Sequence, residues 1–299
     1  MCNCGGERMR ILLTGWAGFI GSHVLDRLLQ KGHEVYAYDT MENPCLEYVA
    51  QRRRDPNFTV LPSLYSTGQT DYDVVLHIGA LGSSPRSISH FTESWESNVK
   101  KSFKILSNGN YKHFIFTSSS SVYGDHNGQV VNTQLTDLRP KSPYATWKLH
   151  VEQMIKMFTS KYTIFRLFNV YGPRQAIDYE FGPVIPKLID NKETIKIYNQ
   201  GENMRCFTYI SDVADLLVTA AEKRVTGIFN LCSVPIKVKK IVSILQDRGC
   251  AKNIQYVKEN RSVDIEKSMG DTSATRHVFG WEPKVQIEEG LIKTIDYYK

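Results

Sequence analysis

Long apolar runs are missing from this sequence. Its longest, such as Ile11 to Leu13, fall far short of the roughly 20 residues that cross a bilayer. No charged and then apolar leader with a small-residue cleavage site opens the printed chain, and neither internal repeats nor low-complexity tracts occur. Hydrophobic residues nevertheless make up 41%, which excludes a disordered chain. We therefore expect a globular protein of the cytoplasm.

Closely spaced cysteines and an excess of one charge are also missing. Six cysteines are spread over 299 residues and only Cys2 and Cys4 are close, so we expect reduced thiols and neither a disulfide framework nor a metal site. The net charge of +6 is too small to indicate nucleic acid by itself. The cluster Arg52–Arg54 is interpreted as a solvated loop or helix end, with a position beside a cofactor as the alternative.

The first 170 residues alternate between strand and helix patterns. Short apolar runs predict strands at residues 10–14, 34–38, 58–61, 74–78 and 113–117, and apolar side chains at helical spacing predict helices at residues 19–31 and 94–106. The alternation indicates an α/β fold, a Rossmann-like doubly wound parallel sheet with helices on both faces. Residues 62–73 hold few apolar side chains, so we expect a reduced or missing crossover helix there.

The pattern changes near residue 170, where glycine and proline become frequent. We expect residues 1–9 to form an N-terminal tail. Residues 10–170 form the sheet domain, to which some later segments return, and residues 171–299 form mainly a smaller α/β lobe. Because no flexible linker separates the two lobes, they should interleave, with the ligand site in the cleft between them.

A glycine-rich segment joins the first predicted strand to the first helix. Glycines permit a sharp turn and a close approach to phosphate, and the helix N-terminus attracts a pyrophosphate. Asp39 ends the next strand, where a carboxylate binds ribose hydroxyls and repels a 2′-phosphate. The pattern predicts NAD rather than NADP; the alternative is a tight turn with a solvated aspartate. The expected contacts are Gly15, Gly18, Phe19, Ile20, Gly21 and Asp39.

Tyr144 and Lys148 are four residues apart and therefore share one face of a predicted helix. A free phenol has a pKa of about 10. An ammonium at about 4 Å favours the phenolate by roughly 4 kcal/mol at an effective dielectric constant of about 20. Lys148 could thus make Tyr144 a base, with added help from a nicotinamide cation. Serine hydroxyls at the carboxyl end of the strand beginning at His113 could hold the substrate oxygen.

These motifs together resemble the short-chain dehydrogenase/reductase superfamily, specifically its extended branch with G-x-x-G-x-x-G spacing. The resemblance covers almost the whole chain from Arg10. It implies that Ser119 is the catalytic serine beside Tyr144 and Lys148, with Ser118 and Ser120 as neighbouring alternatives. It also implies that the segment ending at Ala80 passes beneath the nicotinamide.

The second half of the chain resembles nucleotide-sugar epimerases and dehydratases, most clearly in Arg166-Leu-Phe-Asn-Val-Tyr-Gly-Pro-Arg174. The resemblance implies that Asn169 binds the diphosphate region of the sugar nucleotide and that Arg205 and Arg261 hold its phosphates. Guanidinium groups suit this role because they present paired donors. Tyr198 is placed to flank the nucleotide base, with simple packing as a nearly equal alternative.

The two serines that follow Ser119 limit the set of possible reactions. Related 4,6-dehydratases carry Asp-Glu at this place and decarboxylases carry Glu, whereas this chain has Ser120 and Ser121, which cannot act as carboxylates. We expect a 4-epimerase in which Tyr144 takes the C4 hydroxyl proton and NAD takes and returns the hydride. A dehydratase, a decarboxylase or a 4-reductase are the alternatives. A non-catalytic NAD sensor and a nucleic-acid-binding protein are less favoured.

The substrate and the assembly follow from the resemblance alone. It implies a UDP-sugar, and the small Ser268 at the pocket gate predicts that N-acetylated hexoses are accepted beside unsubstituted ones. Relatives often form homodimers through helices equivalent to those that contain Ser94 and Tyr144.

Two positions depart from the family pattern. Ser63 stands where many relatives have an aspartate that binds adenine, and Gly82 stands where some epimerases have a lysine near the diphosphate. The residues that could substitute for that lysine are Ser83, Ser84, Arg86 and Ser87.

Overall fold

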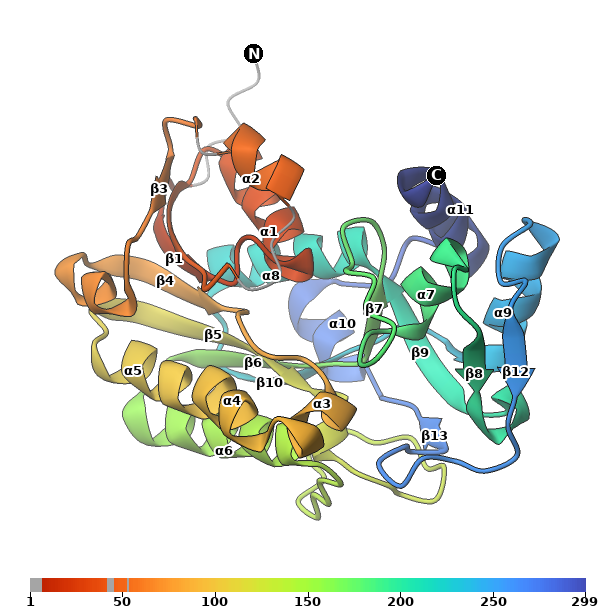
Figure 1. The fold of residues 1–299 in the computed structure, drawn as a ribbon. Helices are drawn as coiled ribbons and strands as arrows, with labels where there is room; N and C mark the ends of the chain where they lie inside the picture. Colours follow the sequence, from red (N-terminus) through yellow and green to blue (C-terminus); the bar gives the residue numbers. More distant parts are fainter. Residues whose placement is uncertain (1–6, 42–45, 53) are drawn as a thin grey trace.

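The computed structural model describes residues 7–41, 46–52 and 54–299, so Cys2, Cys4 and Arg53 lie outside the described residues. Its larger sheet has seven parallel strands in the order β10-β6-β5-β4-β1-β2-β3 (Figure 1). The strands are β1 (Arg10–Thr14), β2 (Glu34–Tyr38), β3 (Phe58–Val60), β4 (Tyr72–His77), β5 (Tyr111–Ser119), β6 (Tyr162–Leu167) and β10 (Gly227–Leu231). The predicted fold class is confirmed. The strand order reverses between β1 and β4, which is where such sheets bind ligands.

Helices cover both faces of this sheet. One face carries α1 (Phe19–Gln30), α2 (Leu46–Arg52) and α8 (Ile210–Lys223), and α10 (Ser273–Phe279) packs beside β10 and α8. The other carries α3 (Ser84–Ser89), α4 (Phe91–Trp95), α5 (Lys101–Ser107) and α6 (Pro143–Phe158) (Figure 1).

The structure tests three local predictions, which concern a helix, a crossover segment and an arginine cluster. The predicted helix over 94–106 is divided, because residues Glu96–Lys100 form a π-helical turn between α4 and α5. The expected reduction of the crossover is confirmed, since it holds only a 3-10 helix at Leu64–Gln69. Arg52 ends α2 and pairs with Asp26 at 2.5 Å, which fits the interpretation as a helix end.

The second lobe is built on two small sheets. The first pairs β9 (Met204–Tyr209) with β7 (Asn169–Tyr171), β11 (Pro235–Lys237) and β13 (Lys267–Ser268), and the second pairs β8 (Ile195–Ile197) with β12 (Ile254–Tyr256). The helices α7 (Val184–Asp190), α9 (Val238–Asp247) and α11 (Ile287–Tyr298) surround them (Figure 1). The chain returns from this lobe to the large sheet through α8 and β10.

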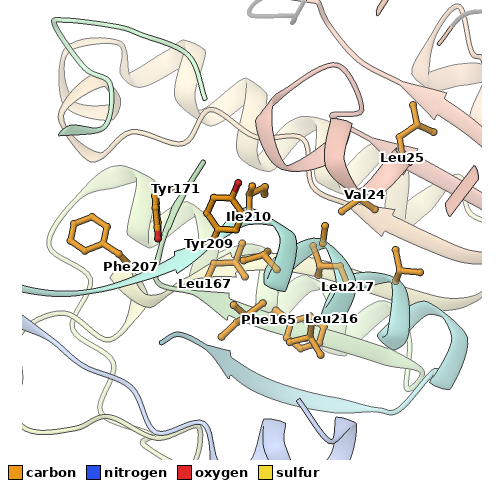
Figure 2. Close-up of a cluster of buried hydrophobic side chains, with 14 of the residues drawn as sticks. Val24, Leu25, Phe165, Leu167, Tyr171, Phe207, Tyr209, Ile210, Leu216 and Leu217 are labelled. Atoms are coloured by element: carbon orange, nitrogen blue, oxygen red, sulfur yellow. The ribbon is translucent and has the colours of Figure 1, made fainter. Parts of the chain in front are cut away.

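One hydrophobic core joins the two lobes (Figure 2). It contains Val24 and Leu25 of α1, Phe165 and Leu167 of β6, Tyr171 of β7, Phe207 and Tyr209 of β9, and Ile210, Leu216 and Leu217 of α8. Met9, which directly precedes β1, also packs into this core at 3% exposure. Because buried apolar area stabilises by about 25 cal/mol per Å², a shared core opposes independent movement of the lobes. No described helix has the length and apolar composition needed to cross a membrane.

Candidate active site

A single cleft at the carboxyl ends of β1, β4 and β5 extends into the second lobe. Every residue that the sequence analysis assigned to cofactor, catalysis or substrate lines it. These are Gly15, Gly18, Phe19, Ile20, Gly21, Asp39, Ala80, Ser119, Tyr144, Lys148, Asn169, Tyr198, Arg205, Arg261 and Ser268. No group of three or more metal-ligating side chains is found among the described residues.

The three loop glycines differ in the space around them. A Cβ atom on Gly21 would lie 1.9 Å from the carbonyl oxygen of Gly15, and one on Gly15 would lie 2.5 Å from the Cα atom of Gly79. Gly21 therefore needs to be glycine where α1 packs against the turn after β1, and Gly15 needs to be glycine where that turn passes the segment after β4. A Cβ atom on Gly18 would approach the same carbonyl oxygen of Gly15 no closer than 3.5 Å. The protein thus leaves the Gly18 side of the loop open.

The carboxylate of Asp39 holds the glycine-rich loop between β1 and α1 in place. Its two carboxylate oxygens accept backbone hydrogen bonds from Ala17 at 3.0 Å and from Met41 at 2.9 Å. Each oxygen keeps a further lone pair, as binding a ribose hydroxyl requires. Gly18 caps α1, whose first turn holds no acidic side chain, so the helix N-terminus can attract an anion. The residues present therefore fit NAD.

Ser119, Tyr144 and Lys148 come together where β5 meets α6. The hydroxyl of Ser119 accepts the backbone N–H of Ser121 at 3.2 Å and hydrogen-bonds to the phenol of Tyr144. Lys148 donates to the carbonyl oxygen of Thr117 at 2.8 Å, and its Nζ lies 5.9 Å from the centroid of the Tyr144 ring. The Ser119 hydroxyl, the Tyr144 phenol and the Lys148 ammonium thus lie close enough together to act at one bound molecule.

The electrostatics of Tyr144 differ from the sequence-based expectation. Burial raises the pKa of the Tyr144 phenol, and the hydrogen bond with Ser119 opposes that rise. Burial also lowers the pKa of Lys148 to about 7, against the attraction of the Glu152 carboxylate. The Lys148 ammonium donates its hydrogen bond to the Thr117 carbonyl oxygen rather than to the phenol. A nearby nicotinium charge would add to the stabilisation of the phenolate.

A buried histidine lies in the floor of the cleft. His77 bonds through one ring nitrogen to Thr14 and through the other to Ser102, each at 2.7 Å, and its ring stacks on Phe116. Burial lowers the pKa of His77 to about 3, with a smaller effect from the charge of Lys148. His77 is therefore neutral at physiological pH and acts as a rigid support.

The predicted phosphate-binding arginines lie in the second lobe. Arg205 donates to the carbonyl oxygens of Met204 at 2.8 Å and Glu266 at 3.1 Å. Arg261 forms two 2.9 Å hydrogen bonds with Asp264, and its guanidinium lies 5.1 Å from the Tyr198 ring centroid. Both guanidiniums are thus oriented by the protein itself.

Asn169 starts β7 and is exposed in the cleft. Ser268 pairs in register with Arg205 and also faces the cleft. Tyr198 directly follows β8, which stops at Ile197, and begins a 3-10 helix (Tyr198–Gly201).

Lys187 is a cleft residue that the sequence analysis missed. It lies on α7, where burial and the positive charge of Arg261 lower its pKa while Asp178 raises it. Lys187 therefore lies in the same part of the cleft as Arg261. Its only sequence signal is a lysine in an otherwise apolar helical run after Pro183.

Ser63 and Gly82, the two positions that depart from the family pattern, lie in different surroundings. Ser63 caps the 3-10 helix of the crossover and does not line the cleft. Gly82 lines it together with Ser83, Ser84 and Arg86. The expectation for Ser87 is wrong, because its buried hydroxyl accepts the backbone N–H of Tyr144 at 3.0 Å and supports the start of α6.

A sequence profile of the NAD dependent epimerase/dehydratase family matches residues 11–232. The chain belongs to this family. Its cofactor is NAD, and the predicted resemblance is confirmed.

Curated and solved relatives agree with this assignment. The chain is 29% identical to an uncharacterized UDP-glucose epimerase, YtcB, of Bacillus subtilis over 97% of its length and 98% of that protein. It is 28% identical to UDP-glucuronic acid decarboxylase 2 of Arabidopsis thaliana over 95% of its length and 66% of that protein. A UDP-N-acetylglucosamine 4-epimerase structure from Methanobrevibacter ruminantium, in complex with UDP-N-acetylmuramic acid, superposes with a TM-score of 0.89. That structure is 28% identical, and the match covers 97% of this chain and 98% of that one.

Proposed function

We propose that this family member is a cytoplasmic nucleotide-sugar 4-epimerase that acts on UDP-hexoses and UDP-N-acetylhexosamines. The observation that carries the proposal is the placement of acids in the cleft. Among the described lining residues, the carboxylates are Asp39, Asp178 and Asp264. Asp39 holds the glycine loop and Asp264 pairs with Arg261.

The remaining carboxylate is also engaged. Asp178 accepts the backbone N–H groups of Glu180 and Phe181, each at 3.0 Å. The residues that follow Ser119 are serines, which cannot act as a carboxylate acid or base. This favours a reaction that requires only one titrating group at the sugar, and 4-epimerisation is such a reaction.

Tyr144 is the group proposed to move the proton. A C4 hydroxyl bound between the Tyr144 phenol and the Ser119 hydroxyl would give its proton to the phenolate and accept a hydrogen bond from Ser119. NAD supplies the acceptor and then the donor of the C4 hydride. Arg205, Arg261 and Asn169 would hold the nucleotide diphosphate, so that the sugar can turn and present its other face.

Proton NMR of the purified protein with separate nucleotide sugars tests this proposal. The sugars are UDP-glucose, UDP-galactose, UDP-N-acetylglucosamine and UDP-glucuronate, without added cofactor and then with NAD. A mixture of the two C4 epimers is the expected result. A 4-keto-6-deoxy product or a pentose would instead identify a dehydratase or a decarboxylase. No change in any sugar, even with NAD, would count against the whole proposal.

Substitution of Ser268 tests the sugar preference. Ser268→Tyr is expected to lower kcat/KM for UDP-N-acetylglucosamine about 10- to 200-fold, because the ring would fill space needed by the acetamido group. The value for UDP-glucose should stay within about threefold. Ser268→Ala is the matched control and should keep both activities. Equal losses on both sugars in the tyrosine variant would show that Ser268 does not gate the pocket.

We also propose that the chain forms a homodimer through α4, α5 and α6. Large apolar side chains stand exposed there, which is typical of an interaction surface. They are Phe91, Trp95, Phe103, Met157 and Phe158, at 39–83% exposure. Phe103→Glu is expected to shift the protein to a monomer in size-exclusion chromatography with light scattering. Val234→Glu, at an apolar position in the other lobe that is more exposed (78%, against 49% for Phe103), should leave the dimer intact. A monomeric parent protein would contradict this proposal.

A further inference from the structure

A third ionisable residue continues the face of α6 that carries Tyr144 and Lys148. Glu152 lies one turn beyond Lys148, is fully buried and does not line the cleft. Its Oε1 accepts hydrogen bonds from Arg166 Nε at 3.0 Å and from Ser118 Oγ at 2.5 Å, and its Oε2 accepts from Arg166 Nη2 at 2.7 Å. Arg166 is itself 2% exposed, so the ion pair is buried on both sides.

The partners of Glu152 belong to the two strands that form the catalytic corner. Ser118 on β5 and Arg166 on β6 are direct neighbours in register. The residues on either side of Ser118 are those that meet the catalytic helix. Thr117 accepts the ammonium of Lys148, and Ser119 bonds to Tyr144. One carboxylate therefore joins α6 to β5 and β6 at the point that sets the spacing of all three catalytic groups.

A buried ion pair contributes little net stability when it joins a helix to a sheet. The desolvation of both ions commonly exceeds their attraction, and apolar side chains of similar volume would stabilise the fold as well or better. Ile155 and Val151, which lie on the same helix, show that apolar packing is available there. The charge at Glu152 is thus better explained by an effect on its neighbours.

The groups that face Lys148 show what this effect is. On α6 they are Tyr144 and Glu152. From β4 comes His77, which is neutral because burial lowers its pKa to about 3. From β5 come the Phe116 ring, 4.6 Å from Nζ, and the Thr117 carbonyl. Arg166 of β6 pairs with Glu152, and its guanidinium lies 4.7 Å from the centroid of the Tyr123 ring. Glu152 is the anionic group among them, and it opposes the lowering of the Lys148 pKa by burial.

We propose that Glu152 is a positioning residue for the reaction, which locks α6 against the end of β5 and keeps the Lys148 ammonium charged. The inference rests on the proposed role of Tyr144 as the group that moves the proton, and on the expectation that the charge of Lys148 favours its phenolate. It extends the functional unit of α6 from two residues to three, spaced four residues apart. Arg166 balances the charge of Glu152, while the Glu152 carboxylate is the charged group that acts on Lys148.

The first test is the pH profile of Glu152→Gln. Glutamine keeps the shape and one acceptor oxygen but removes the charge. The alkaline limb of kcat is expected to move to lower pH by about one unit, because an opposite charge nearby favours the charged form of a lysine by one unit or more. At pH values above that limb, kcat falls about tenfold, while KM stays within about twofold. Glu152→Asp should restore the limb. Ser118→Ala is the matched control, since it removes a hydrogen bond to the same carboxylate and leaves the charge.

A second measurement needs no turnover. The NMR titration of 13Cε-labelled lysine in the NAD-bound protein reports the charge of Lys148 directly, and Lys148→Arg assigns the signal. The Lys148 signal is expected to titrate at lower pH in Glu152→Gln than in the parent protein. Because no sugar is involved, this result stands even if the proposed epimerase activity is absent.

A double variant covers the case in which a lone buried Arg166 unfolds the protein. Glu152→Gln with Arg166→Gln removes both charges and keeps hydrogen-bonding groups at both positions. It should shift the Lys148 titration in the same direction by a smaller amount, because Glu152 is the charge that acts on the pKa of Lys148 and the loss of the Arg166 charge offsets only part of its removal. An unchanged titration in this variant, or a loss of kcat that is equal at every pH in Glu152→Gln, would overturn the proposal.

Discussion

Tyr144→Phe is expected to lower kcat about a thousandfold with every sugar that the parent protein converts, while KM changes less than about threefold. Proton transfer by a positioned side chain contributes about 10²- to 10⁴-fold to catalysis, and phenylalanine removes only the hydroxyl that performs it. The ring would keep its packing at the start of α6, where the backbone N–H of Tyr144 bonds to Ser87. Steady-state kinetics with a coupled assay or NMR measure both constants.

The control for this substitution is another buried tyrosine. Tyr123 lies outside the cleft lining, and its hydroxyl donates to Asn230 at 2.7 Å. Tyr123→Phe should lose about 1 kcal/mol of unfolding free energy with its hydrogen bond. It should keep kcat within about threefold. NAD binding by Tyr144→Phe should match the parent protein, which separates a lost proton transfer from a disturbed fold. A Tyr144→Phe variant with near-normal kcat would remove Tyr144 from the proposed mechanism.

Local sequence patterns predicted the parts of this site that local geometry determines. The turn at Gly15, the position of Asp39 directly after β2 and the helix spacing of Tyr144 and Lys148 each depend on residues within one or two elements. Their meeting in one cleft follows from the parallel sheet, because the carboxyl ends of its strands lie at one edge.

Other features depend on contacts that no local pattern contains. Glu152 and Arg166 are 14 residues apart in sequence, and nothing in the sequence alone shows that their side chains meet. Ser87 resembles its serine neighbours in the sequence, but the helix turns its hydroxyl away from the cleft toward Tyr144. Lys187 belongs to the cleft only because α7 packs beside the segment that carries Arg261. In each case the role of the residue is decided by tertiary packing.

The different space around Gly18 and Gly21 predicts different effects of alanine substitutions on stability and on NAD affinity. Gly21→Ala is expected to lower the unfolding free energy of nucleotide-free protein by about 1–3 kcal/mol, as overpacked cores do. The reason is that the three atoms nearest the new Cβ are backbone: the carbonyl oxygen and carbon of Gly15 at 1.9 and 2.6 Å, and the Cα atom of Trp16 at 2.9 Å. No side chain can move aside, so α1 must shift from β1. NAD affinity should fall at least about a hundredfold, because the loop would lose the geometry that receives the pyrophosphate.

Gly18→Ala distinguishes an effect on NAD binding from an effect on protein stability. The new Cβ would meet ordinary van der Waals distance to Gly15, so the unfolding free energy should fall by less than about 1 kcal/mol. NAD affinity should still fall at least about tenfold, because the methyl group would stand at the N-terminus of α1, where the pyrophosphate is expected. Denaturant unfolding and calorimetric NAD titration measure the two effects separately. If Gly18→Ala bound NAD as tightly as the parent protein, the open side of the loop would not be where the phosphates lie. The position of the cofactor relative to Tyr144 would then have to be derived from Asp39 alone.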